Sequence, residues 1–242
     1  MYLDSDTALE AGSIDSAVKG FNGILKVQAQ NGVCSPVPLN KGIFAQYKAL
    51  VEASWADDID NWDSSSACIN ARVGVFTKAS LNEAGGFNEN YPDASVEDHE
   101  FGIRYSKKYR IYTNKDIIAR HKFPGFKKTV INYWDRTYKM MQLANKHKDA
   151  LKTGGVSVRS ALQYLMCPLF LLLLPFALLF PIVWFLWLAA TVVFMVTSIN
   201  VIKRLFSKGP FFGIFGIVIH AVYGVVITLS ALKFYLKLLL KR

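Results

Sequence analysis

The stretch that decides the fold of this chain runs Ala84-Gly85-Gly86-Phe87-Asn88-Glu89 and resumes as Ser95-Val96-Glu97-Asp98-His99-Glu100-Phe101-Gly102-Ile103-Arg104. The paired glycines predict the end of a helix and a turn. A serine followed three residues later by an acid, with apolar residues behind it, predicts the start of the next helix. Two adjacent carboxylates therefore stand in the first turn of a helix, directly behind a loop.

Patterns on either side of this stretch predict a mixed α/β region over residues 1–126. Short apolar runs alternate there with helical patterns, and a polar loop follows Trp55. The expected helices are 7–19, 44–54, 77–84, 95–108 and 130–147. The expected strands are 1–3, 24–29, 67–73, 109–112 and 117–121.

Two long apolar runs dominate the rest of the chain. Residues 160–202 contain no Asp, Glu, Lys or Arg, and neither do residues 209–232. A membrane-spanning helix needs about 20 apolar residues, so the first run has room for two spans and the second for one. We expect spans over about 161–180, 182–202 and 210–232 within a transmembrane region 160–242, preceded by a basic juxtamembrane helix and linker over 127–159.

The net charge of +10 is unevenly distributed. Residues 1–119 carry 11 basic and 16 acidic side chains, whereas residues 120–242 carry 17 basic and 2 acidic ones. The basic side chains flank the apolar runs, where they favour the cytoplasmic face and attract anionic lipid head groups. We therefore expect an integral membrane protein with membrane lipids, and no nucleic acid, as partners, and with its N-terminal part in the cytoplasm. Three spans place the basic tail on the opposite face, so either the tail lies along the interface or one apolar segment is re-entrant.

Asp4-Ser5-Asp6 follows a short apolar strand. Two acids in a loop are commonly no more than solvated side chains. The same carboxylates also supply the hard oxygen ligands that Mg²⁺ or Mn²⁺ prefers, and such an ion neutralises a departing diphosphate. These residues alone leave both interpretations open.

Glu97 and Asp98 also have two compatible interpretations. Acids in a first helical turn are stabilised by the helix dipole, and Ser95 with Asp98 fits a capping box. A carboxylate at a helix start behind a loop is equally suited to accept a proton from a hydroxyl. His121, which ends a predicted strand, is as a lone histidine more commonly structural than a ligand.

In identity, order and spacing these elements resemble the family 2, GT-A-type glycosyltransferases across residues 1–125. The resemblance rests on a strand ending in Asp-x-Asp, then Gly-Gly-Phe-Asn-Glu, Glu-Asp, a strand ending in His, a basic helix and membrane spans. It implies an inverting, metal-dependent transfer of one sugar from a nucleotide-sugar donor. By this resemblance, Asp4, Asp6 and His121 bind the metal ion (Mg²⁺ or Mn²⁺) and the donor diphosphate. Asp98 is the catalytic general base. Glu97, Gly85 and Gly86 form the acceptor site.

Other features refine this resemblance. The Gln-x-x-Arg-Trp motif of processive synthases is missing, and the nearest match is Tyr133-Trp134-Asp135-Arg136-Thr137, which favours transfer of a single sugar. The basic collar beside the membrane spans suggests a lipid-linked acceptor, with another saccharide as the alternative. Because the family's nucleotide-binding half precedes the Asp-x-Asp strand, we expect an N-terminally truncated, partial GT-A (Rossmann-like) domain followed by about three transmembrane helices. The alternative to an active enzyme is an inactive remnant or a subunit of a split glycosyltransferase.

Overall fold

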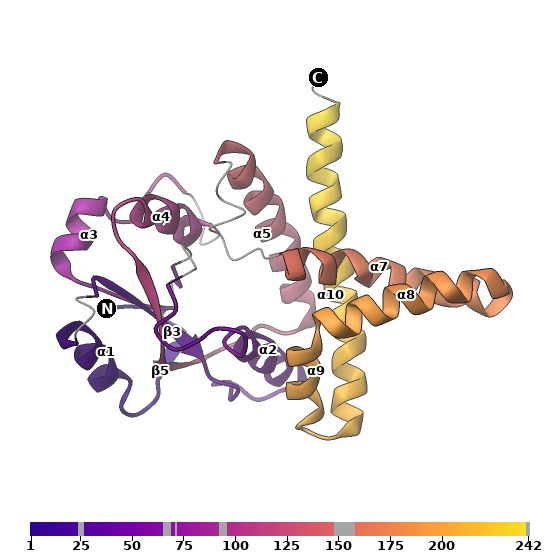
Figure 1. The fold of residues 1–242 in the computed structure, drawn as a ribbon, viewed down its shortest axis with the longest axis horizontal. Coiled ribbons are helices and arrows are strands. Elements are labelled where there is room, and N and C mark those ends of the chain that lie inside the picture. Colours follow the sequence, from indigo (N-terminus) through magenta and orange to yellow (C-terminus); the bar gives the residue numbers. More distant parts are fainter. Residues whose placement is uncertain (24–26, 65–68, 71, 92–95, 148–157, 241–242) are drawn as a thin grey trace. The chain divides into compact units, whose positions relative to one another are not determined.

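The computed structural model describes residues 1–23, 27–64, 69–70, 72–91, 96–147 and 158–240 (Figure 1). The chain forms two compact units. The α/β unit comprises Met1–Gly125 with Leu143–Gly155, and the helical unit comprises Phe126–Gln142 with Val156–Arg242. A mixed α/β chain with long apolar helices in its C-terminal part, as expected from the sequence, is confirmed.

The α/β unit is built on a five-stranded mixed sheet in the order β1-β4-β3-β5-β2. Strands β3 and β5 run parallel, and the other neighbours run antiparallel. The strands are β1 (Tyr2–Leu3), β2 (Thr7–Leu9), β3 (Ala29–Cys34), β4 (Val73–Phe76) and β5 (Ile111–His121). The helices are α1 (Ser13–Asn22), α2 (Ile43–Ser54), α3 (Lys78–Ala84) and α4 (Glu97–Ser106).

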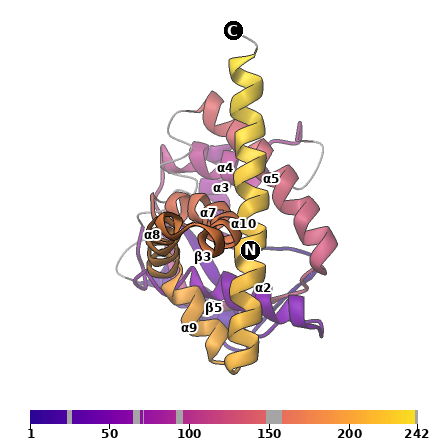
Figure 2. The ribbon, with the colours of Figure 1, turned by 90° about the vertical axis from the view of Figure 1, so that its right-hand side faces the viewer.

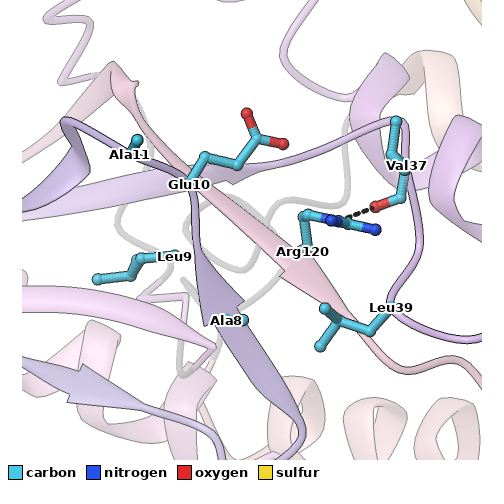
Figure 3. Close-up of a pocket in the computed structure, with 7 residues that line it drawn as sticks. All are labelled: Ala8, Leu9, Glu10, Ala11, Val37, Leu39 and Arg120. Carbon is cyan, nitrogen blue, oxygen red and sulfur yellow. Dashed lines mark hydrogen bonds between the residues drawn. The ribbon is translucent and has the colours of Figure 1, made fainter.

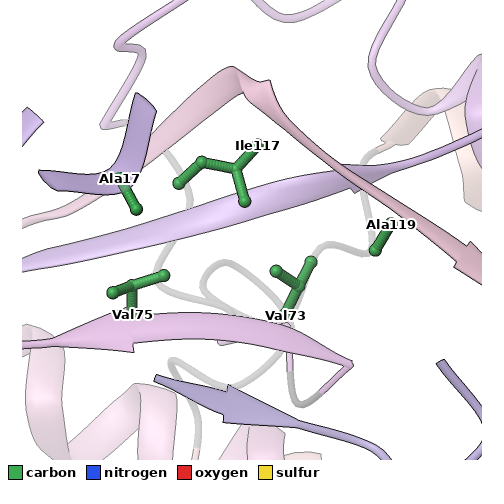
Figure 4. Close-up of a cluster of buried hydrophobic side chains, with 5 residues drawn as sticks. All are labelled: Ala17, Val73, Val75, Ile117 and Ala119. Atoms are coloured by element: carbon green, nitrogen blue, oxygen red, sulfur yellow. The ribbon is translucent and has the colours of Figure 1, made fainter. Parts of the chain in front are cut away.

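Apolar clusters pack against both faces of this sheet. On one face Ala17 of α1 packs with side chains from β4 and β5, namely Val73, Val75, Ile117 and Ala119 (Figure 4). On the other face α4 contributes Phe101 and Tyr105 to a cluster that includes Phe76. Val75 and Phe76 are consecutive in β4, so they point to opposite faces, as the two-residue period of a strand requires.

The expected helix over 7–19 is wrong in its first half. Residues Thr7–Leu9 form strand β2, which pairs with Ala119–His121 of β5. Helix α1 begins only after Gly12, whose φ of 84° lies in the left-handed region and ends any continuous helix. Pairing with a distant strand thus overrides the local helical pattern.

The expected strand over 24–29 is also misplaced, since β3 begins at Ala29; residues 24–26 lie outside the described residues. Gln30 and Asn31 of β3 are buried. The Gln30 amide donates to the carbonyl of Ala17 at 2.9 Å, and Asn114 donates to Gln30 Oε1 at 2.8 Å. A strand with buried, hydrogen-bonded polar side chains shows no apolar alternation in its sequence.

The remaining boundaries in the α/β unit differ less. Helices α2 and α3 confirm the expected 44–54 and 77–84. The strand expected over 67–73 is displaced, because β4 begins only at Val73. Residues 65–68 and 71 lie outside the described residues. The two strands expected over 109–112 and 117–121 are one, β5, because β3 and β2 pair with successive parts of it.

The helical unit contains four further helices and most of α5 (Phe126–Lys146). The four are α7 (Val158–Leu179), α8 (Pro181–Thr197), α9 (Ile199–Phe206) and α10 (Pro210–Leu239). In length and composition α7 and α10 are each suited to cross a membrane. The second expected span, 182–202, is broken: α8 and α9 form a pair bent by 75°.

Candidate functional site

One edge of the sheet gathers side chains that are far apart in the sequence. Strands β1, β3 and β5 end at this edge, in Leu3, Cys34 and His121, and the antiparallel strands β4 and β2 begin there. Leu3 faces Val73 across the antiparallel β1–β4 pair. Asp4, one residue after Leu3, and Arg72, one residue before Val73, are therefore neighbours.

The turn Asp4-Ser5-Asp6-Thr7 brings its two acids together at this edge. The amide of Thr7 donates to the carbonyl of Asp4 at 3.1 Å, which closes a β-turn. This turn joins β1 and β2, which lie at opposite ends of the strand order. In a flat sheet of five strands, the two outer strands would lie about 19 Å apart. The chain from Leu3 to Thr7 covers only four residue steps of ~3.5 Å each and cannot bridge that distance. The sheet therefore curls here, which brings β1 and β2 together.

Asp4, Asp6 and His121 form a compact cluster within the described residues. One ligand atom of each lies within 4.8 Å of the others. The Asp6 Oδ1 and His121 Nε2 atoms are 3.1 Å apart, and the His121 side chain is only 12% exposed. Adjacent ligands of an octahedral Mg²⁺ lie about 3.0 Å apart, since each is about 2.1 Å from the ion. The separation and the oxygen-rich donor set therefore fit a small divalent cation.

The protonation of His121 is compatible with such a role. Burial is the main cause of a lowered pKa, and the nearby Arg72 lowers it further, against the opposing effects of Asp6, Glu52 and Asp4. Nδ1 of His121 is buried and has no hydrogen-bond partner among the described residues. A lowered pKa keeps the imidazole neutral near pH 7, the form that binds a metal ion.

A buried charge network lies behind this cluster. Glu52 of α2 is 3% exposed and pairs with Arg72 through both carboxylate oxygens, with Nη2–Oε1 at 3.1 Å. Lys48, one turn earlier in α2, places its Nζ 3.0 Å from Oε1 of Glu52. Cys34 Sγ lies 3.6 Å from Glu52 and 3.5 Å from Arg72. The network joins α2 to the ends of two strands, and sequence patterns gave no sign of it.

The network carries one more positive charge than negative. Burial disfavours the ionised form of Glu52, but Arg72 and Lys48 outweigh it and lower its pKa to about 2. Burial likewise disfavours the charged form of Arg72, yet Glu52 and, to a smaller extent, Asp4 keep its pKa above the ordinary value. Cys34 is neutral, since burial and Glu52 raise its pKa to about 11. Two cations thus share one buried carboxylate beside Asp4.

The other predicted site residues lie at the end of α3 and in the first turn of α4. Helix α3 begins at Thr77, whose hydroxyl accepts from the amide of Ser80, and ends at Gly85. Gly85 and Gly86 have φ values of 80° and 65°, which side chains other than hydrogen disfavour. These two glycines therefore form the turn that the sequence predicted.

Arg104 of α4 fastens this turn to the helix that carries the two acids. Its Nη1 donates to the carbonyl of Ala84 and its Nη2 to that of Gly86, both at 2.6 Å. The same guanidinium forms a two-bond pair with Glu100, one turn earlier in α4. Four of the five donors of Arg104 are thereby used, and no sequence pattern assigns a role to this residue.

Asp98 and Glu97 stand in the first turn of α4, as expected. The position before the helix is occupied by Val96, without a side-chain cap, and Ser95 lies outside the described residues. Asp98 Oδ1 accepts from the amide of His99 at 2.8 Å, and the Asp98 side chain is 14% exposed. Asp98 therefore uses one oxygen locally, and no described residue donates to the other.

The tryptophans of the polar loop after α2 do not form a common platform. Trp62 has a positive φ of 66°, and its amide donates to the carbonyl of Thr113 at 2.7 Å. Its ring lies against Gly20 of α1, where an added Cβ would come within 2.6 Å. Trp62 thus anchors the loop, whereas Trp55 is half exposed.

A surface depression of about 430 Å³ lies between β2 and the segment after β3 (Figure 3). Its polar side chains are Glu10, which accepts from Ser35 at 2.6 Å, and Arg120, which donates to the carbonyls of Val37 and Pro38. Arg120 and His121 are consecutive in β5 and point to opposite faces of it. The depression is therefore separate from the cluster of Asp4, Asp6 and His121.

No protein-family model matches this chain, and no curated protein sequence matches it at a significant level.

Proposed function

We propose that this chain belongs to a membrane-bound, inverting glycosyltransferase of family 2, GT-A type, which transfers one sugar from a nucleotide-sugar donor on the cytoplasmic face. The observation that carries the proposal is the convergence of Asp4, Asp6 and His121 at one edge of a curled sheet. The glycine turn and the acids of α4, in the same unit, supply the acceptor side of the proposed reaction.

Asp98 is the proposed base. Its carboxylate accepts the proton of an acceptor hydroxyl as the hydroxyl oxygen forms a bond to the anomeric carbon of the donor sugar. The bond from that carbon to the diphosphate breaks on the opposite side, and its electrons leave with the nucleoside diphosphate. Glu97, Gly85 and Gly86 shape the acceptor loop, and Arg104 holds that loop against α4.

Asp4, Asp6 and His121 are the proposed ligands of Mg²⁺ or Mn²⁺. When bound, the ion supplies positive charge for the departing diphosphate. Arg72 adds to this charge, since it adjoins Asp4 and belongs to a network with a surplus cation. With a divalent ion bound, Asp4, Asp6 and Glu52 together with Arg72 and Lys48 leave a net charge of +1 at the donor end, which is suited to a polyanion.

Manganese binding to the full chain in detergent tests the donor end. Electron paramagnetic resonance of Mn²⁺ is expected to detect one site, which Asp6→Asn weakens at least tenfold and Asp98→Asn leaves unchanged. Equal Mn²⁺ binding by wild type and Asp6→Asn contradicts the assignment of the cluster as a metal site.

Turnover tests the acceptor end. With a panel of uridine and guanosine diphosphate sugars, Asp98→Asn is expected to keep donor binding and to lose a factor of about 10²–10⁴ in transfer. A chain that binds Mn²⁺ but none of these nucleotides supports the remnant or split-subunit alternative. Equal transfer to a soluble saccharide before and after delipidation counts against a lipid-linked acceptor and favours a saccharide one.

A further inference from the structure

The most exposed apolar surface of the helical unit belongs to a hairpin of α7 and α8. The two helices pack along each other and are joined at Phe180. At the open end, Arg159 Nε donates to the carbonyl of Thr197 at 2.8 Å. At the closed end, Leu179 and Ile182 are more than 70% exposed, and residues 160–202 carry no charge. Such a surface is stable only against an apolar solvent.

The contacts between helix α10 and this hairpin described below lie toward the open end of the hairpin. Gln163 of α7 contacts His220, Cys167 packs on Gly224, and Thr228 donates to the carbonyl of Tyr164 at 2.6 Å. A Cβ on Gly224 would come within 2.2 Å of Cys167 Sγ, so the two helices are in close contact at this point. The hairpin crosses α10 steeply, and the two views agree on this (Figures 1 and 2).

Charged segments accompany α10 along both of its halves. Near its start, Leu205 and Phe206 of α9 pack on Gly216 and Gly213, and α9 also carries the exposed Lys203. Hence the first half of α10 lies beside a basic helix.

The second half of α10 lies beside α5. Phe126 and Tyr133 contact Tyr223, in the middle of α10, and Tyr138 contacts Phe234 near its end. The same part of α5 exposes three basic side chains, Lys127, Lys128 and Arg136. If α10 crossed a bilayer, these charges would lie in or near the hydrocarbon core, where they are strongly disfavoured.

Helix α10 carries an apolar face, beside which Lys233 and Lys237 are exposed near its end. Its exposed apolar side chains follow helical spacing and therefore share one face: Phe211, Ile214, Val218, Leu229, Leu232 and Leu236. A helix with protein on one side and a continuous apolar face on the other is suited to lie in the plane of a membrane surface.

The length of the hairpin sets its depth. The residues from Leu172 to Leu179, beyond the cluster that α7 shares with α10, extend about 12 Å, whereas the hydrocarbon core is about 30 Å thick. We propose that α7 and α8 form a re-entrant hairpin, which enters and leaves the bilayer through one face, and that α10 lies along that same face. The ligand of both surfaces is the acyl-chain region of a lipid bilayer.

This arrangement also removes the conflict between three spans and the charge pattern. Arg159, Lys203, Lys208 and Lys237 all remain on the face from which the hairpin enters, in agreement with the preference of basic residues for one side. The inference concerns the helical unit alone and is independent of the proposed enzymatic activity.

Cysteine labelling in sealed membrane vesicles tests the topology. In the full chain with its three cysteines replaced, single cysteines are introduced by Ser207→Cys, Phe180→Cys and Leu240→Cys. A membrane-impermeant maleimide is expected to label positions 207 and 240 from the same face and position 180 from neither. Labelling in denaturant serves as the control that each cysteine is present.

Three results overturn the inference. They are labelling of position 180 from the face opposite to 207, labelling of 207 and 240 from opposite faces, and failure of either 207 or 240 to react from any face. A nitroxide on the same cysteines gives an independent reading of depth. Collisions with oxygen should exceed those with a water-soluble nickel chelate at position 180, and the reverse should hold at 207 and 240.

Discussion

Replacing Glu52 by glutamine is expected to destabilise the folded chain strongly, although the two side chains have nearly the same shape. Glu52 is buried and accepts from both Arg72 and Lys48. The amide removes the one negative charge of this network and leaves the buried Lys48 and the partly buried Arg72 without it. Breaking a buried ion pair on one side typically costs about 3–5 kcal/mol.

The pKa of Glu52 leads to a cost of the same size. The folded structure lowers this pKa from 4.5 to about 2. Each unit corresponds to about 1.4 kcal/mol, so folding shifts the balance between the carboxylate and its neutral form by about 3 kcal/mol in favour of the carboxylate. Because glutamine resembles the neutral form, Glu52→Gln should cost about this much.

The assay is thermal or urea unfolding of the full chain in detergent, with Glu83→Gln as the matched control. Glu83 also has two partners, Lys108 and Tyr109, but it is exposed, and surface pairs of that kind contribute little to stability. If Glu52→Gln destabilises the chain no more than Glu83→Gln, the reasoning from buried charge is refuted.

The dependence on pH follows from the same pKa. Since folding lowers the pKa of Glu52, its contribution to stability is fully present above about pH 4.5 and is lost as the pH falls toward about 2. Wild type should lose this contribution on acidification through that window. The Glu52→Gln variant should show a correspondingly smaller loss.

Three further predictions concern other parts of the chain. Gly224→Val should lower the thermal unfolding midpoint in detergent, at a cost of about 1–3 kcal/mol, because its Cβ would overlap Cys167 Sγ. Gly86→Ala should lower the free energy of unfolding in urea by about 1 kcal/mol, because the φ of Gly86 is 65°. Gly125→Ala is the control: Gly125 has an ordinary φ of −72° and open space around it, so this change should leave the free energy of unfolding unaltered. Arg72→Met removes a positive charge beside Asp4, so it should tighten Mn²⁺ binding by about tenfold (~1.4 kcal/mol) when no diphosphate is present. The same variant should bind inorganic pyrophosphate more weakly. Titration calorimetry that shows neither change contradicts the electrostatic link between Arg72 and Asp4.

Local patterns in the sequence predicted the elements that depend on local chemistry. The glycine turn, the helix from Thr77 and the long apolar helices all follow from residues that are close together in the chain. The Asp-x-Asp pattern left Asp4 and Asp6 open between solvated acids and metal ligands, and the choice of these acids together with His121 as a metal site came from a resemblance. Their convergence depends on the curl of the sheet, which no short pattern encodes.

Pairing between distant segments accounts for most of what the sequence did not predict. Thr7–Leu9 is a strand only because β5 lies beside it, and Gln30 is buried only because Ala17 and Asn114 satisfy its amide. Arg72 and Glu52 lie 20 residues apart, in segments with ordinary polar composition. A contact of this kind leaves no periodic trace in the sequence.

The surplus positive charge of the buried network limits which ligands the site can bind. An apolar replacement of a buried ion pair is commonly as stable as the pair, so stability alone gives little reason to place two cations around one buried carboxylate. The surplus lies beside Asp4, at the edge where three strands end and where ligands of α/β sheets commonly bind. At this position the surplus positive charge weakens the binding of a metal ion alone and favours the binding of a metal ion together with a polyanion. A diphosphate with a divalent cation meets both requirements, which is consistent with the donor in the proposed function.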